Sequence, residues 1–325
     1  PSPTYDGILS DTAGICAIAH EKGIPVLVDE AHGAHLGLHP AFPPNAMGQG
    51  ADLAVASLHK MLPSLTQTAV LHATGARLSL PQVVRQAGIF QSSSPSYLLM
   101  ASMDGCIRLL EEEGEALFAA WKARLDKFDQ LASGLKHLRL LGHGTEAGAS
   151  YPGIFALDPA KILISTRNSA LTGVELKNRL REEYKIELEM ALDHYAVAMT
   201  GLGTDDTMPT RLAEALLALD EAAGPNEEAP AEPLPTYELP PRRMSLEEAA
   251  MAPGGLTFLY DGIGKVCGEY IWAYPPGIPL VTPGEEITAN LVETVETLYR
   301  SGVRLLGTRG KPPFTTFAVA DEENQ

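Results

Sequence analysis

Two short apolar runs, each followed at once by side chains that can do chemistry, constrain this chain most. Residues 24–28 (Ile-Pro-Val-Leu-Val) lead directly to Asp29, and residues 53–56 (Leu-Ala-Val-Ala) lead through Ser-Leu-His to Lys60. Short apolar runs of this kind are typical of fully buried parallel strands. Open α/β sheets place their ligands at the carboxyl ends of such strands. The pattern therefore predicts that Asp29 and Lys60 lie at one edge of a parallel sheet.

An acid and a lysine at the same sheet edge suit pyridoxal 5′-phosphate (PLP). The carboxylate keeps the pyridine nitrogen protonated, and the lysine forms a Schiff base with the aldehyde. Ser57 and His59, close to Lys60, offer a hydroxyl and an imidazole that could hold the phosphate. Ala31 lies two residues after Asp29, hence on the same strand face, where a small side chain lets a flat ring approach. We predict Lys60, Asp29 and His59 as catalytic residues.

The same residues allow other interpretations. Lys60 could be an exposed loop lysine, as most lysines are, and Asp29 could simply cap a turn. Asp29, His32 and His35 are also residue types that bind metals, but glycines interrupt the segment and no further Cys or acid cluster completes a coordination set. A Ser-His-Asp hydrolase lacks support because there is no Gly-x-Ser-x-Gly elbow. We therefore expect no metal centre and no hydrolase triad.

Composition narrows the class of partner. The 325 residues are 45% hydrophobic, enough for a substantial core, and the formal net charge is −17. This charge argues against nucleic acid or an anionic membrane as a partner and is compatible with a cationic substrate. Three widely spaced cysteines indicate no disulfide framework. No run approaches the roughly 18 apolar residues of a membrane helix and no signal peptide is recognisable, so we expect a cytoplasmic protein.

The pattern of elements indicates several domains. Residues 8–22 read as a helix capped by Asp11 or Ser10 and ended by Gly23. Further expected strands are 68–73, 154–157 and 161–165, and further expected helical regions are 95–135, 173–185, 211–223 and one that opens at Ser245. We predict the domain ranges 1–114, 115–223 and 243–325, with a Pro/Glu-rich linker at 224–242.

The beginning of the chain is unusual. It starts Pro-Ser-Pro-Thr-Tyr-Asp-Gly, without an initiator Met, and reads as a loop that leaves a strand. Only three strands can be placed before residue 115, whereas a sheet usually has about five to six. We therefore expect the chain to be the carboxyl-terminal part of a larger protein. The upstream part would lie on the same chain or on a separate one, or the protein would be an inactive remnant.

Three further segments are weaker candidates. Residues 91–97 (Gln-Ser-Ser-Ser-Pro-Ser-Tyr) either cap the following helix or bind phosphate at its N-terminus, in a neighbouring subunit. Residues 274–279 (Tyr-Pro-Pro-Gly-Ile-Pro) form a rigid loop of an architectural kind. Glu269 could be an acid that faces substrate, although surface glutamates are common.

These segments, taken in order, resemble the bacterial ornithine/lysine/arginine decarboxylases, in particular the shorter members without a wing domain. The segments that carry the resemblance are 29–35, 57–60, 65–68 (Leu-Thr-Gln-Thr), 93–97 and 274–279. The resemblance implies an α/β chain. Its large domain would be fold-type I PLP-dependent (aspartate aminotransferase-like) and incomplete, followed by a small α+β domain and a carboxyl-terminal α+β domain. It also implies a homodimer or higher oligomer with active sites at the subunit interface.

The resemblance assigns roles by position. Lys60 is the Schiff-base lysine, Asp29 pairs with the pyridine nitrogen, Ala31 lies against the ring, and Ser57 and His59 contact the phosphate. The full predicted cofactor-binding set is Lys60, Asp29, Ala31, His32, Ser57, His59, Ser93 and Ser94, in which Ser93 or Ser94 reaches the neighbouring subunit's phosphate. The implied activity is decarboxylation of arginine, lysine or ornithine, in polyamine or acid-stress metabolism. The alternatives are another fold-type I PLP reaction, such as transamination, or an inactive fragment.

Overall fold

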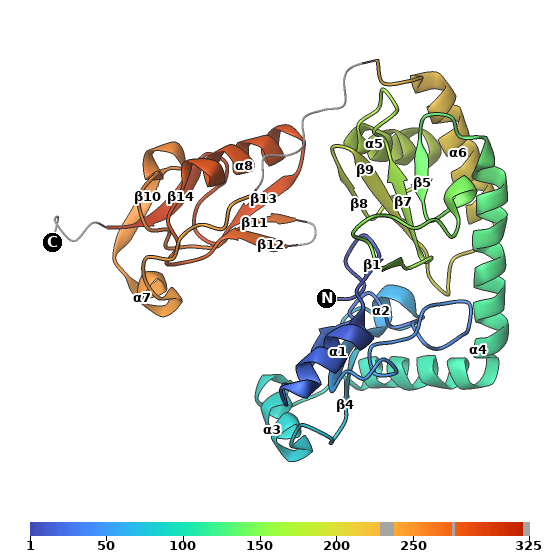
Figure 1. The fold of residues 1–325 in the computed structure, drawn as a ribbon, viewed down its shortest axis with the longest axis horizontal. Helices are drawn as coiled ribbons and strands as arrows, with labels where there is room; N and C mark the ends of the chain where they lie inside the picture. The colour runs from blue at the N-terminus through green and yellow to red at the C-terminus, as the bar shows by residue number, and fades with distance from the viewer. Residues whose placement is uncertain (228–236, 275–276, 321–325) are drawn as a thin grey trace. The chain divides into compact units, whose positions relative to one another are not determined.

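Three strands form the sheet that carries the two chemistry-bearing segments (Figure 1). They are β2 (Leu27–Asp29), β3 (Leu53–Ser57) and β4 (Ala69–Ala73), in the order β2-β3-β4. β2 and β3 are parallel, as the sequence predicts, and Asp29 lies opposite Val55. β4 is antiparallel to β3. The carboxyl ends of β2 and β3 therefore lie side by side.

The structure is a computed structural model that describes residues 1–227, 237–274 and 277–320. The chain divides into two compact units. The first comprises residues 1–171, 176–189 and 195–225, and the second comprises 172–175, 190–194 and 226–325. Residues 228–236 of the predicted linker and the two prolines at 275–276 of the predicted rigid loop lie outside the described residues.

The prediction that the first two strands are buried on both faces is wrong. On one face Val28 packs with Cys16 and Ala54 in a small core. Leu27, however, is 62% exposed, and Ile24, just before the strand, is 56% exposed. The reason is that side chains alternate along β2, so Val28 lies in this core while Leu27 and Asp29 lie exposed on the other face.

The first helix, α1 (Thr12–Glu21), is shorter than predicted because Ile8 and Leu9 form β1 instead, which pairs with β6 (Ala156–Leu157). Asp11 caps α1 by accepting a hydrogen bond from the N–H of Gly14, at 2.9 Å. Gly23 follows the helix with φ +67°, the left-handed conformation that glycine adopts without strain. The cap and the stop are thus the residues that the sequence indicates.

A 35-residue helix, α4 (Tyr97–Leu131), is bent and runs along two sides of the first unit (Figure 1). Its buried residues are Cys106, Gly114, Phe118, Trp121, Leu125 and Phe128, and it packs against α6 (Met208–Ala223). The shorter α3 (Leu80–Phe90), which the sequence did not indicate, precedes it. The predicted domain boundary at 114/115 falls inside α4, and the domain division stays a prediction.

A second sheet lies in the first unit, with β5 (Arg139–Leu141), β7 (Lys161–Ser165) and β9 (Tyr195–Met199) as antiparallel neighbours. The core side chains of β7 are fully buried. Asp220 of α6 accepts hydrogen bonds from three successive backbone N–H groups, those of residues 136–138, which fixes the approach to β5. The remaining elements of this stretch are the short helices η1 (Ala132–Gly134) and η2 (Gly144–Glu146), α5 (Gly173–Tyr184) and β8 (Met190–Leu192).

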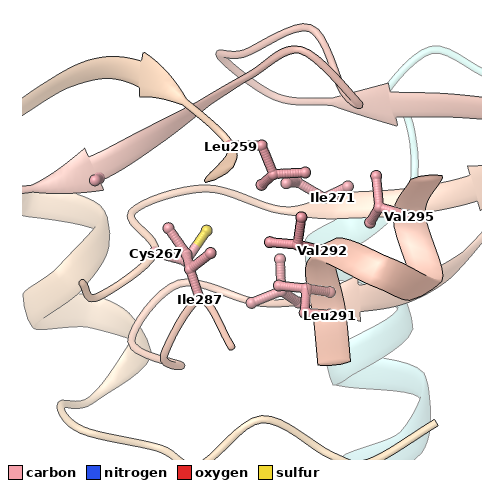
Figure 2. Packing of buried hydrophobic residues seen from close by; sticks show 9 residues of the cluster. Leu259, Cys267, Ile271, Ile287, Leu291, Val292 and Val295 are labelled. Carbon is pink, nitrogen blue, oxygen red and sulfur yellow. The ribbon is translucent and has the colours of Figure 1, made fainter. Parts of the chain in front are cut away.

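The second unit contains a separate core, shown in Figure 2. Leu291, Val292 and Val295 of α8 lie against residues that include Leu259 and Ile271. The strands are β10 (Gly254–Phe258), paired with β14 (Thr315–Val319), and a sheet of order β12-β11-β13 with β11 (Ile271–Tyr274), β12 (Ile278–Val281) and β13 (Arg304–Gly307). The helices are α7 (Leu246–Met251), η3 (Tyr260–Gly262) and α8 (Ala289–Arg300). The predicted helix start at Ser245 is confirmed as a capping box with Glu248.

Candidate active site

Lys60 lies in α2 (Leu58–Met61), a single helical turn that directly follows β3. Its Nζ is 3.0 Å from Nε2 of His32. His32 is buried in the turn that follows β2, three residues after Asp29. A side-chain hydrogen bond thus joins the two segments that follow the parallel strands, and Asp29 and Lys60 come to the same edge of the sheet.

A second lysine, absent from the predicted set, contacts the other side of His32. Nζ of Lys161 is 2.8 Å from His32 Nδ1, and Lys161 is only 2% exposed. The Tyr5 ring lies 4.7 Å from the His32 ring, centroid to centroid. The one local signal for Lys161 is a cation at the start of an otherwise apolar strand, Ile162 to Ile164. A charge at such a position needs a partner, and its partner is 129 residues away.

The surroundings set the protonation of His32 and of Lys161. Burial lowers the pKa of His32 to about 3, and the charges of Lys161 and then Lys60 contribute in the same direction. His32 is therefore a neutral imidazole at pH 7. Burial also lowers the pKa of Lys161, to about 8, although Asp158 and Glu189 favour its charged form. At pH 7 Lys161 remains mostly an ammonium group.

His35 does not face the same space as His32. Its Nε2 is 3.0 Å from Oδ1 of Asp158, and both side chains are fully buried. Its ring packs against Phe42 and Trp121. Burial opposes the charge of Asp158, but His35 and the N–H of Ala160 outweigh it and lower the pKa of this carboxyl. His35 thus contacts a core carboxylate, whereas His32 contacts the two lysines.

Asp29 is the last residue of β2, and its side chain is exposed. Oδ1 accepts a hydrogen bond from the N–H of Ala31 at 3.0 Å. The prediction that Ala31 shares a strand face with Asp29 is wrong in its reasoning, because β2 ends at Asp29 and Ala31 lies in the following turn. Ala31 is half-buried next to the carboxylate, and its role against the ring stays a prediction.

Ser57 directly precedes α2, and His59 lies within it. Ser57 ends β3 and occupies the cap position, but its hydroxyl makes no capping hydrogen bond. Nδ1 of His59 is 3.0 Å from the carbonyl oxygen of Thr68. Because a carbonyl only accepts, Nδ1 carries the hydrogen and Nε2 is left for another partner. The sequence predicts a strand-to-loop transition here. The strand does end at Ser57, but His59 lies in a helical turn instead of a loop.

Ser93 and Ser94 lie in the exposed loop between α3 and α4. The cap of α4 is Ser96, whose side chain accepts from the N–H of Leu99. In the part of the chain that the structure describes, no hydrogen bond joins Ser93 or Ser94 to the Lys60 segment. Their role toward a neighbouring subunit stays a prediction.

Glu269, the weaker candidate in the second unit, has a structural role. It is 1% exposed. Its carboxylate accepts from the N–H groups of Arg309, Gly310 and Phe317 and from the hydroxyl of Thr316, at 2.6–3.0 Å. These hydrogen bonds join Glu269 to the segments 309–310 and 316–317 of that unit.

Glu30, between Asp29 and Ala31 in sequence, is 4% exposed, and its carboxylate accepts from the N–H of Ala46 at 2.8 Å. Burial raises the pKa of Glu30 from 4.5 to about 7.

A raised carboxyl pKa stabilises the fold below pH 4.5, and this stability is lost as the pH rises through about 7. Glu30→Gln should therefore gain about 2 kcal/mol over wild type at pH 8 and much less at pH 5. Urea unfolding at both pH values measures this, with exposed Glu21→Gln as the control, and an equal effect of Glu30→Gln at both would contradict it.

Known proteins are similar to this chain in sequence and in fold. Residues 1–141 match the family model described as Orn/Lys/Arg decarboxylase, major domain. An arginine decarboxylase of Bacillus anthracis is 31% identical over 317 residues, which cover 94% of this chain and 62% of that protein. The chain is thus similar to the Orn/Lys/Arg decarboxylase family. An arginine decarboxylase of Bacillus subtilis is also 31% identical, over 312 residues, with the same coverage of both chains.

The fold of this chain also matches a solved structure, that of the constitutive lysine decarboxylase of E. coli. The TM-score is 0.77 at 19% identity, and the match covers 98% of this chain and 57% of the other. The predicted fold-type I α/β class is thereby confirmed. The chain spans about three fifths of the length of the curated relatives that it matches. No helix in the described ranges has the length and apolar character that crossing a bilayer requires.

Proposed function

We propose that this chain carries the catalytic lysine of a PLP-dependent decarboxylase that acts on a basic amino acid, with arginine the first candidate. One observation carries the proposal. The Lys60 amine lies at the carboxyl ends of β2 and β3, hydrogen-bonded to a histidine three residues after Asp29, in a chain similar to this decarboxylase family. Lysine or ornithine are the other candidate substrates.

The residues present fit PLP. Lys60 offers an amine for the aldehyde carbon, and Asp29 offers an exposed carboxylate for the pyridine nitrogen. The Ser57 hydroxyl does not cap α2, and His59 keeps Nε2 directed away from its backbone partner, so both can contact a phosphate. PLP, when bound, supplies an electron sink for the bond that breaks at the substrate's α-carbon.

The side chains of this chain would orient and hold the cofactor. Asp29 would keep the pyridine nitrogen protonated, since a carboxylate favours a cation at hydrogen-bond distance. Lys60 would anchor the aldehyde end, and Ala31 leaves room for the ring. His32 orients the Lys60 amine through the 3.0 Å hydrogen bond. We assign the reaction to polyamine or acid-stress metabolism, because its product is an amine and each turnover takes up a proton.

The assembly is part of the same proposal. Ser93 and Ser94 are exposed and lie apart from the hydrogen bonds around Lys60. This agrees with a homo-oligomer in which one of them reaches the phosphate bound by a neighbouring subunit. The formal charge of −17 suits a cationic substrate through long-range attraction.

Borohydride reduction of the PLP-loaded full-length protein, followed by peptide mapping, tests the assignment. We expect one modified lysine, Lys60, and the peptide map separates it from Lys161 on the other side of His32. Carbon dioxide release from arginine, lysine and ornithine then ranks the substrates. Modification of another lysine, or keto-acid formation without carbon dioxide release, would overturn the proposal.

A further inference from the structure

The turn at residues 64–68 supplies the hydrogen-bond partner of the His59 ring. Nδ1 of His59 donates to the carbonyl oxygen of Thr68 at 3.0 Å, and the N–H of Leu58, the first residue of α2, donates to the same oxygen at 3.1 Å. A carbonyl oxygen has two lone pairs, and both have a donor here. This one carbonyl therefore fixes the start of the helix that carries Lys60 and the direction of the His59 ring.

The turn that presents this carbonyl contains a strained residue. Gln67, which is exposed and directly precedes Thr68, has φ +84°, a left-handed conformation that residues with a side chain rarely adopt. Such a conformation is unfavourable by itself and persists only where the surrounding contacts impose it. The position of the Thr68 carbonyl therefore depends on the contacts that hold the turn.

Hydroxyl groups hold the turn in this shape. Within it, the Thr68 hydroxyl lies 2.8 Å from the carbonyl oxygen of Leu65 and 2.8 Å from Oγ of Ser64, and it donates to one of them. From outside it, Oγ of Ser102 in α4 accepts from the N–H of Leu65 at 2.8 Å and lies 3.3 Å from Oγ of Ser64. Thr68 is only 2% exposed, and Ser102 is half-buried. Ser102 thus ties the turn to a helix that lies outside it.

We propose that Ser102 is a positioning residue for the phosphate group of the cofactor and acts through the turn 64–68 and the His59 ring. Loss of its hydroxyl would take the acceptor from the N–H of Leu65, and the strained turn could then relax and move the Thr68 carbonyl. The His59 ring would lose the partner that holds Nδ1–H and leaves Nε2 for a phosphate oxygen. The step from His59 to the phosphate rests on the proposed function, whereas the link from Ser102 to His59 does not.

The His59 ring in the cofactor-free, full-length protein is the first readout. ¹⁵N NMR of histidine-labelled protein at pH 8, assigned by the signals that His59→Gln removes, should show a neutral wild-type ring with its hydrogen on Nδ1. Ser102→Ala should give a mixture of the two tautomers, because Nδ1–H no longer has a fixed acceptor. Ser102→Thr, which keeps a hydroxyl, should restore the wild-type spectrum. A hydrogen on Nε2 in the wild type, or the same tautomer in wild type and Ser102→Ala, would overturn the proposal.

The affinity for the cofactor with and without its phosphate is the second readout. Ser102→Ala should weaken equilibrium binding of PLP about tenfold and leave that of pyridoxal, which lacks the phosphate, within about twofold of wild type. Pyridoxal still offers its aldehyde to Lys60 and its ring nitrogen to Asp29, so a general loss of structure would weaken both ligands. Ser133→Ala is the matched control, because it removes a hydroxyl that donates to the carbonyl oxygen of Gln130, and it should change neither affinity.

A double-mutant cycle shows whether Ser102 acts through His59. His59→Ala should weaken PLP binding at least about tenfold, and the further change Ser102→Ala should then weaken it by no more than about twofold. Additive losses, or equal weakening of PLP and pyridoxal by Ser102→Ala, would overturn the proposal. If borohydride marks a lysine other than Lys60, the proposed function fails, and the His59 tautomers still decide whether Ser102 holds the turn.

Discussion

Lys60→Ala should lower carbon dioxide release at least about 1000-fold, with arginine as the first substrate assayed. The substitution removes the amine that would hold the cofactor's aldehyde and receive the substrate in exchange. Lys60 is partly exposed on a single helical turn, so the loss of its side chain should change stability little. A radiometric assay of carbon dioxide from carboxyl-labelled amino acid, at saturating PLP, measures the effect.

Two variants control this result. Lys22→Ala removes an exposed lysine at the end of α1 and should leave the rate unchanged. Lys60→Arg keeps a positive charge but offers no amine that can form a Schiff base, so it should be as inactive as Lys60→Ala. Activity of Lys60→Arg near that of wild type would mean that Lys60 contributes only charge.

Asp29→Asn should lower the rate about 100-fold or more while PLP still binds. An amide cannot stabilise the protonated pyridine nitrogen as a carboxylate does, and the electron sink depends on that proton. The amide oxygen can still accept from the N–H of Ala31, as Oδ1 does at 3.0 Å, so the turn after β2 should be kept. Equilibrium binding of PLP and steady-state decarboxylation, measured on the same preparation, separate the two effects.

Asp11→Asn is the matched control, since Asp11 is also an exposed aspartate that accepts from a backbone N–H and asparagine caps a helix equally well. Its rate should equal that of wild type. If Asp29→Asn turns over within a few-fold of wild type, Asp29 does not tune the cofactor.

Local patterns were sufficient for the elements that hold the first half of the site. β3, Leu53–Ser57, contains the predicted apolar run 53–56, because four consecutive apolar residues end at a polar cluster that begins with Ser57. Parallel pairing of β2 with β3 then places Asp29 and Lys60 at one edge. The resemblance to the decarboxylases rests on these same segments, which is why the amino-acid sequence by itself indicates the family.

The rest of the site depends on contacts that no local pattern encodes. Lys161 meets His32 across 129 residues, and Tyr5 meets it from near the start of the chain. The sequence of β7 shows only a cation at the start of an apolar strand, which indicates that Lys161 needs a partner but does not identify His32 as that partner. Ala31 was misplaced for a different reason, because the Asp29 carboxylate turns the chain one residue after the strand ends.

The indole of Trp121 in α4 holds two segments of the first unit together. Trp121, half-way along the C-terminal part of this helix, donates from Nε1 to the hydroxyl of Thr200 just after β9, at 3.0 Å. The same indole lies 4.5 Å from the ring of Phe42 and 5.2 Å from that of His35, in the segment that follows β2. One indole thus contacts both the segment that follows β2 and the residue that follows β9. Loss of this side chain would therefore remove packing from two distant segments of the first unit at once.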